Sequence, residues 1–105
     1  MEIIFDLETT GTDYATDAIT QFTFLKKQTS EYFASLVNPK QPISLGAMKI
    51  TGITNVDVEI YPPFEHFIPQ ILDFIGDEPV YLIAHNGDRF DKLLLFRFLR
   101  SNGYS

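Results

Sequence analysis

The chain has 105 residues, a net charge of −6 at pH 7 and no cysteine. This length allows one small domain, and the lack of cysteine excludes a disulfide framework and a thiolate zinc site. Because 45% of the residues are hydrophobic and ten are phenylalanine, the chain has enough apolar material for a packed core. The acidic balance argues against broad electrostatic adhesion to nucleic acid, but it is compatible with a metal-dependent nuclease.

The sequence contains no apolar run of membrane-spanning length and no signal-peptide pattern before its first predicted strand. We therefore expect an intracellular protein without membrane contact. The basic residues are unevenly distributed, since Arg89, Lys92, Arg97 and Arg100 make up half of the eight lysines and arginines. A few basic side chains beside an acidic pocket are sufficient to receive one end of a nucleic acid strand.

The first half of the chain predicts three strands and a helix. Residues 2–7 have the pattern of a short buried strand, and residues 18–27 and 31–37 are rich in β-branched and aromatic side chains. Their spacing predicts an antiparallel meander that ends before Pro39. Residues 44–50 predict a short helix with Ser44 as its N-cap and a stop near Gly52.

The second half predicts two helices around one strand. Residues 64–75 have apolar side chains at helical spacing, and Pro69 is expected to kink this helix or shift its start. Residues 80–84 form a continuous apolar run, which predicts a strand buried on both faces. Residues 88–101 predict the last helix. The fold class is therefore α/β, with flanking helices on a mixed sheet in which the fourth strand lies parallel to the first.

Two carboxylates, Asp6 and Glu8, come at the end of the first predicted strand. Residues i and i+2 of a strand point to the same face, so the two acids lie side by side and repel each other. Hard divalent cations such as Mg²⁺ or Mn²⁺ bind paired carboxylate oxygens and would remove this repulsion. Thr9-Thr10-Gly11 has turn chemistry that places the pair at a carboxyl end of the sheet, where open α/β sheets bind ligands. The alternative is an exposed strand whose acids are simply hydrated.

A third carboxylate, Asp91, falls in the first turn of the last predicted helix. It shares a helix face with Leu94, Leu95 and Phe98, where an unpaired charge is costly. Aspartate is also a favoured residue in a first helical turn, so a purely structural role stays open. We favour a metal ligand, because a parallel fourth strand would bring Asp91 next to Asp6 and Glu8.

The segments Phe5–Gly11 and Ala84–Asp91 together resemble the DEDD (DnaQ-like) superfamily of 3′–5′ exonucleases, which has a ribonuclease-H-like fold. The segment Ile83–Asp91 is most similar to the three-prime repair exonucleases. The resemblance implies two divalent cations, Mg²⁺ or Mn²⁺, held by the catalytic residues Asp6, Glu8 and Asp91. It also implies that Leu7, Thr9, Thr10 and Asn86 surround the terminal nucleotide, with Asn86 touching the substrate or bracing its own turn.

The superfamily pattern continues with a third motif, a His or Tyr followed a few residues later by an Asp. Residues 92–105 contain no such pair, and His66 is interpreted as a surface histidine. The last helix also carries Leu93 and Phe96 on the side opposite Asp91, where an apolar surface requires cover. We therefore expect residues 1–105 to be the N-terminal portion of an exonuclease-like domain, truncated in comparison with the superfamily.

Two functions follow from these observations. The leading hypothesis is a metal-dependent 3′–5′ exonuclease, or the metal-binding part of one, which hydrolyses terminal phosphodiesters and releases nucleoside monophosphates. Its expected partner is a nucleic acid 3′ end, with single-stranded DNA preferred to RNA. The alternative is a catalytically inactive exonuclease-like binding or regulatory module. The resemblance implies that the missing third motif supplies the general base and a fourth carboxylate, so the nuclease should be weak or inactive unless a C-terminal segment, a second copy of the chain or another subunit complements it. The binding module would have its partner at the side formed by Leu93 and Phe96.

Overall fold

The computed structural model describes residues 1–13, 15–85 and 89–103. In these ranges the chain forms a sheet with the strand order β3-β2-β1-β4. The four strands are β1 (Glu2–Thr9), β2 (Ile19–Lys26), β3 (Tyr32–Leu36) and β4 (Tyr81–Ala84). Strands β1, β2 and β3 pair antiparallel, whereas β4 pairs parallel with β1. The predicted meander and its parallel fourth strand are therefore confirmed.

The helices begin and end largely where the sequence predicts. They are α1 (Leu45–Thr51), α2 (Asn55–Val58), α3 (Phe64–Ile75) and α4 (Arg89–Ser101). At the start of α1 the Ser44 side chain accepts a hydrogen bond from the amide of Ala47, and at its end Gly52 adopts a φ of 75°. Glycine populates this left-handed conformation without steric cost, which explains why the helix stops there.

Two details of the helices concern α2 and Pro69. The short helix α2 was not predicted, although Thr54 and Asp57 form a capping box at its start. Pro69 lies inside α3, which still begins at Phe64, so the proline does not shift the start of the helix. No helix within the described ranges has both the length and the apolar character that crossing a membrane requires.

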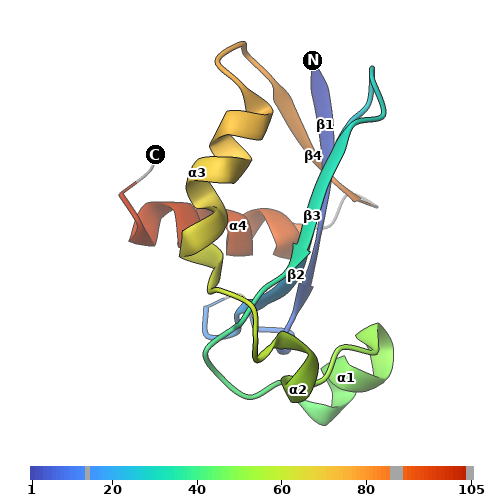
Figure 1. The fold of residues 1–105 in the computed structure, drawn as a ribbon, viewed down its shortest axis with the longest axis vertical. Coiled ribbons are helices and arrows are strands. Elements are labelled where there is room, and N and C mark those ends of the chain that lie inside the picture. Colours follow the sequence, from blue (N-terminus) through green and yellow to red (C-terminus); the bar gives the residue numbers. More distant parts are fainter. Residues whose placement is uncertain (14, 86–88, 104–105) are drawn as a thin grey trace.

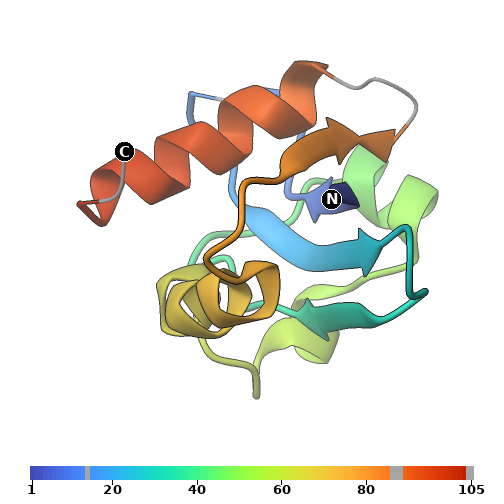
Figure 2. The same ribbon diagram turned by 90° about the horizontal axis from the view of Figure 1, so that it is seen from above.

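One face of the sheet is covered by α3 and α4, which lie on the same side of it (Figures 1 and 2). Its central side chain is Phe22, which is 0% exposed. The ring of Phe22 contacts four other aromatic rings at centroid distances between 5.1 and 5.9 Å, those of Phe24, Phe33, Phe64 and Phe67. The buried residues of α4 are Asp91, Leu94 and Leu95, so the aspartate lies on the face that packs on the sheet.

The opposite face of the sheet is more open. An apolar row crosses all four strands there, formed by Ile83, Ile4, Leu25 and Tyr32, which stand opposite one another in the strand register. The prediction that residues 80–84 are buried on both faces is wrong, because Tyr81 is 75% and Ile83 is 37% exposed. Strand β4 is an edge strand, so its apolar run includes side chains on the uncovered face.

Candidate active site

The acidic pair lies on the open face of β1. Ile3, Phe5 and Leu7 point into the core, so Asp6 and Glu8 point to the other side, as their spacing predicts. Asp6 stands opposite Thr23 of β2 and Glu8 opposite Gln21. Partial burial raises the pKa of the Glu8 carboxyl above its usual range, and the neighbouring charge of Asp6 raises it further. The pair therefore carries an electrostatic cost that a bound cation would relieve.

The end of β4 makes room for the third carboxylate. Strand β4 pairs with β1 only as far as Phe5, which stands opposite Ala84. Beyond that point a side chain of α4 bonds to the edge of β1 in place of a strand. Oδ2 of Asp91 accepts a hydrogen bond from the Leu7 amide at 3.0 Å. Asp91 is only 2% exposed, and its first-turn position places its charge near the positive end of the helix dipole.

This contact joins residues that are 84 positions apart in the chain. Leu7 lies between Asp6 and Glu8, so the structure anchors the Asp91 carboxylate to the main chain of the acidic pair. The predicted placement of Asp91 beside the strand that carries Asp6 and Glu8 is therefore confirmed, through its contact with the main chain of Leu7. It arises because a parallel β4 delivers the start of α4 to the carboxyl end of β1.

The three carboxylates do not form a preformed metal cage. Across residues 1–13, 15–85 and 89–103, no group of three His, Cys, Asp or Glu side chains is gathered closely enough to hold an ion. The donor set nevertheless fits Mg²⁺ or Mn²⁺, since all three side chains offer hard oxygen ligands. Asp6, Glu8 and Asp91 are therefore the residues that would hold such ions, after side-chain adjustment.

The turn after β1 is held by a buried threonine. Thr10 is 1% exposed, and its hydroxyl donates to Oδ1 of Asp17 at 2.8 Å. The same hydroxyl accepts hydrogen bonds from the Ala18 amide at 3.0 Å and from Nε2 of Gln41 at 3.1 Å. A Cβ on Gly11 would lie 2.6 Å from Oδ2 of Asp17, so a side chain at position 11 would displace this carboxylate. The turn is thus fixed by contacts within the protein.

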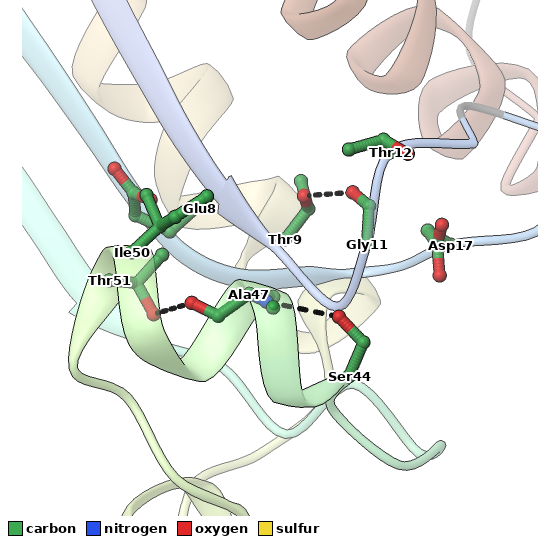
Figure 3. A pocket seen from close by; sticks show the side chains of 10 residues that line it. Glu8, Thr9, Gly11, Thr12, Asp17, Ser44, Ala47, Ile50 and Thr51 are labelled. Carbon is green, nitrogen blue, oxygen red and sulfur yellow. Dashed lines mark hydrogen bonds between the residues drawn. The ribbon is translucent and has the colours of Figure 1, made fainter.

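Two cavities flank this turn and share Thr9, Gly11 and Thr12 as lining residues. The larger, with a volume of about 530 Å³, lies between the end of β1 and α1 (Figure 3). It is lined by Glu8 and by residues of α1 and its N-cap, among them Ser44, Ile50 and Thr51. The smaller, of about 340 Å³, is lined by Leu7 and Asp91. Each cavity therefore contains at least one predicted metal ligand.

The predicted substrate-binding residues occupy different environments. Thr9 lines both cavities, and its hydroxyl donates to the carbonyl oxygen of Gly11 at 2.6 Å. Leu7 lines the cavity beside Asp91. Thr10 is engaged inside the turn, and Asn86 lies outside the described residues. Contact of these four residues with a nucleotide stays a prediction.

Sequence reasoning missed the residues that hold the site together. Asp17 and Gln41 order the turn through Thr10, and the Arg97 side chain of α4 donates to the carbonyl oxygen of Asp17. Only a weak local signal was available, in the form of an acidic residue that closes a turn rich in Thr and Gly. His66 and His85 are both exposed, which confirms the interpretation of His66 as a surface histidine.

We expect Glu8→Gln to stabilise the metal-free protein near neutral pH. Because folding raises the pKa of Glu8, the native state holds this proton more tightly than the unfolded chain. Stability is then lost as the pH rises from the usual carboxyl range through the raised pKa. Removing the charge should recover on the order of 0.2–1 kcal/mol, the range for charge pairs on a sheet face.

Thermal melting in EDTA at pH 4 and pH 7 tests this prediction. The melting temperature of Glu8→Gln should exceed that of the parent at pH 7, and the difference should shrink at pH 4. The matched control is Glu78→Gln, which removes an exposed acid far from β1 in sequence. A variant that melts below the parent at pH 7 would show that the acidic pair is not repulsive.

An acidic pair at the end of a strand, a buried aspartate beside it and a mixed sheet define the class of metal-dependent nucleases with a ribonuclease-H-like fold. The sequence profile of the exonuclease family RNase_T matches residues 3–100. The chain therefore belongs to this family, which is the DnaQ-like exonuclease group indicated by its first two motifs. Exonucleases of this group generally use divalent cations.

Individual relatives agree with this assignment. The chain is 35% identical over 89 residues to a PolC-type DNA polymerase III from Caldanaerobacter subterraneus, a match that covers 82% of the chain and 6% of the polymerase. It superposes on exonuclease X in complex with 5′-overhanging duplex DNA with a TM-score of 0.72 and 31% identity, over 90% of the chain and 53% of exonuclease X. Exonuclease I shares the fold, with a TM-score of 0.85 at 23% identity over 99% of the chain and 25% of that enzyme. The chain thus spans only part of each relative.

Proposed function

We propose that this chain carries the metal-dependent 3′–5′ exonuclease activity of a DNA-processing enzyme, acting on single-stranded ends. The observation that carries the proposal is the hydrogen bond from the Leu7 amide to Asp91. It anchors a buried carboxylate to the strand that presents Asp6 and Glu8. The complex of exonuclease X with DNA supports DNA as the substrate.

The reaction is hydrolysis of the last phosphodiester. The oxygen of a water molecule attacks the phosphorus of that linkage, and the bond from phosphorus to the 3′ oxygen breaks. One proton of the water ends on the leaving 3′ oxygen, and the other stays on the released 5′-phosphate or passes to solvent. Bound divalent cations would supply Lewis-acid stabilisation of the negative charge on the attacking and leaving oxygens. Asp6, Glu8 and Asp91 would hold these cations beside the phosphate, and Thr9, which lines both cavities, would lie next to the end of the nucleic acid strand.

Digestion of a 5′-labelled single-stranded oligonucleotide with Mg²⁺ or Mn²⁺ tests the proposal. We expect a weak ladder that shortens from the 3′ end and is abolished by EDTA and by Asp6→Asn. The ladder is weak because residues 92–105 contain no His or Tyr with a following Asp to supply the general base. Asp73→Asn serves as the control, because it removes an exposed carboxylate on α3. Shortening from the 5′ end, or cleavage that persists in Asp6→Asn, would contradict the proposal. A parallel RNA substrate decides the preference for DNA.

A second function is favoured by one observation, the absence of a gathered three-carboxylate cluster among the described residues. An exonuclease-like binding module would bind Mn²⁺ weakly and would cleave nothing. Calorimetric titration with Mn²⁺ beside the digestion separates the two functions. Binding without a ladder would support the binding module, whereas binding together with the ladder supports the nuclease.

A further inference from the structure

Helix α4 is tied to the candidate site at two points along its length. In its first turn, Oδ2 of Asp91 accepts the hydrogen bond from the Leu7 amide. Six residues later, Nη2 of Arg97 donates to the carbonyl oxygen of Asp17 at 2.6 Å, a contact between residues 80 positions apart. The guanidinium of Arg97 also lies 4.7 Å from the centre of the Phe98 ring. Both polar contacts reach the segment that begins with β1 and continues through its turn.

The second contact point is the residue that orders the turn. Oδ1 of Asp17 accepts from the Thr10 hydroxyl at 2.8 Å, and Oδ2 accepts from the amide of Asp13 at 2.8 Å. The Asp17 carboxylate also occupies the space beside Gly11. The hydrogen bond from Arg97 to the carbonyl oxygen of Asp17 therefore links α4 to the residue whose carboxylate binds Thr10 and Asp13 in the turn.

Apolar packing alone does not fix where a helix lies along the sheet. The buried residues Leu94 and Leu95 hold α4 against the sheet, but the hydrophobic effect is not directional. A hydrogen bond has a narrow range of distance and angle, and one from a guanidinium is stronger than a neutral one. The contact from Arg97 to Asp17 thus limits sliding and rotation of α4, which would move Asp91 relative to Leu7.

We propose that Arg97 is a positioning residue that keeps Asp91 in register with the acidic pair of β1. The effect of Arg97 on metal binding rests on the proposed function, whereas the hydrogen bond from Arg97 to Asp17 does not. Arg97 donates to the main chain of the turn at Asp17 and lies against Phe98 of its own helix, so it acts through the placement of α4. Its loss should weaken metal binding about tenfold or more, the range observed when residues that orient metal ligands are replaced.

The test uses Arg97→Met, Arg97→Lys and Arg100→Met, with amide hydrogen exchange measured by NMR without metal. Arg100 lies on the same helix, and together with Arg97 it lines a cavity beside Leu93 and Phe96. Arg100→Met therefore removes an equal charge and keeps Arg97. The reporter is the Leu7 amide, which donates to Asp91. The reference is the Lys26 amide at the far end of β2, which donates to the carbonyl oxygen of Glu31 at 2.8 Å.

Arg97→Met should lower protection at Leu7 about tenfold or more, the change expected on losing a hydrogen bond to a charged group. Protection at Lys26 should stay within roughly twofold, because this amide lies at the opposite end of β2 from Asp17 and its hydrogen bond does not involve α4. Arg97→Lys should restore part of the protection at Leu7, and Arg100→Met should leave both amides unchanged. Equal losses at Leu7 and Lys26 would overturn the proposal, because they would show only a loss of general stability. Unchanged protection at Leu7 would overturn it as well.

Titration with Mn²⁺, together with the exchange measurement, distinguishes failure of the positioning role of Arg97 from failure of the proposed nuclease function. If the parent chain binds no Mn²⁺ but Arg97→Met selectively exposes the Leu7 amide, the positioning contact stands and the nuclease proposal fails. If the parent binds Mn²⁺ and cleaves DNA while Arg97→Met matches it in exchange, affinity and cleavage, the positioning role fails and the nuclease stands.

Discussion

Replacing Asp91 with asparagine is expected to abolish cleavage while leaving the fold intact. The amide oxygen of asparagine still accepts the hydrogen bond that the Leu7 amide gives to Asp91. The negative charge is lost, however, and with it a ligand for a divalent cation. Stabilisation of transition-state charge by metal ions amounts to several kcal/mol, so the rate should fall on the order of a thousandfold.

The measurement is the initial rate of 3′-end shortening at saturating Mn²⁺, together with a thermal melt. The expected result is loss of the ladder at a nearly unchanged melting temperature. Asp73→Asn again provides the control, as an exposed aspartate on α3. If Asp91→Asn cleaves as fast as the parent, then the buried aspartate serves only the start of α4, which is the structural alternative that its first-turn position left open.

The second large effect concerns the core. Phe22→Ala should destabilise the protein by about 3–5 kcal/mol, because it removes a fully buried ring and leaves a cavity between the sheet and α3. Domains of this size have a total stability of about 5–15 kcal/mol, so the variant should lie near its folding threshold at 37 °C. Since β2 pairs directly with β1, metal binding should fail together with the fold.

Urea denaturation followed by circular dichroism measures this loss. Phe96→Ala is the matched control, because it removes the same side chain from a position on α4 that is 50% exposed. Its stability should change by no more than roughly 0.5 kcal/mol. Similar losses in the two variants would mean that the exposed side of α4 contributes to stability as much as the ring cluster around Phe22 does.

Much of the site followed from simple periodicity. The strand period of two placed Asp6 and Glu8 on one face, and the helical period placed Asp91 on the face of Leu94 and Leu95. Parallel pairing of β4 with β1 was predicted from the order of the elements and is confirmed. These features depend on short-range patterns and on a small number of sheet topologies, which a sequence specifies well.

Features set by position in the sheet were harder to predict. An apolar run reads the same in a central strand and in an edge strand, so the exposure of Tyr81 and Ile83 was missed. The contact of Arg97 with Asp17 joins distant segments and has no local pattern. Thr10 belongs to the same turn motif as Thr9, yet its hydroxyl is bonded inside the protein. Which of two adjacent threonines faces inward depends on how the turn folds.

The proposal that Asp6, Glu8 and Asp91 hold divalent cations is tested most directly by the anomalous scattering of Mn²⁺. The crystals of the protein are grown or soaked with the metal and a nucleoside 5′-monophosphate. We expect manganese peaks within coordination distance of Asp6, Glu8 and Asp91, with the phosphate beside them and the Leu7 amide still donating to Asp91. Manganese bound elsewhere, for instance at Asp13 or Asp17 of the turn, with no peak at the acidic pair, would contradict it.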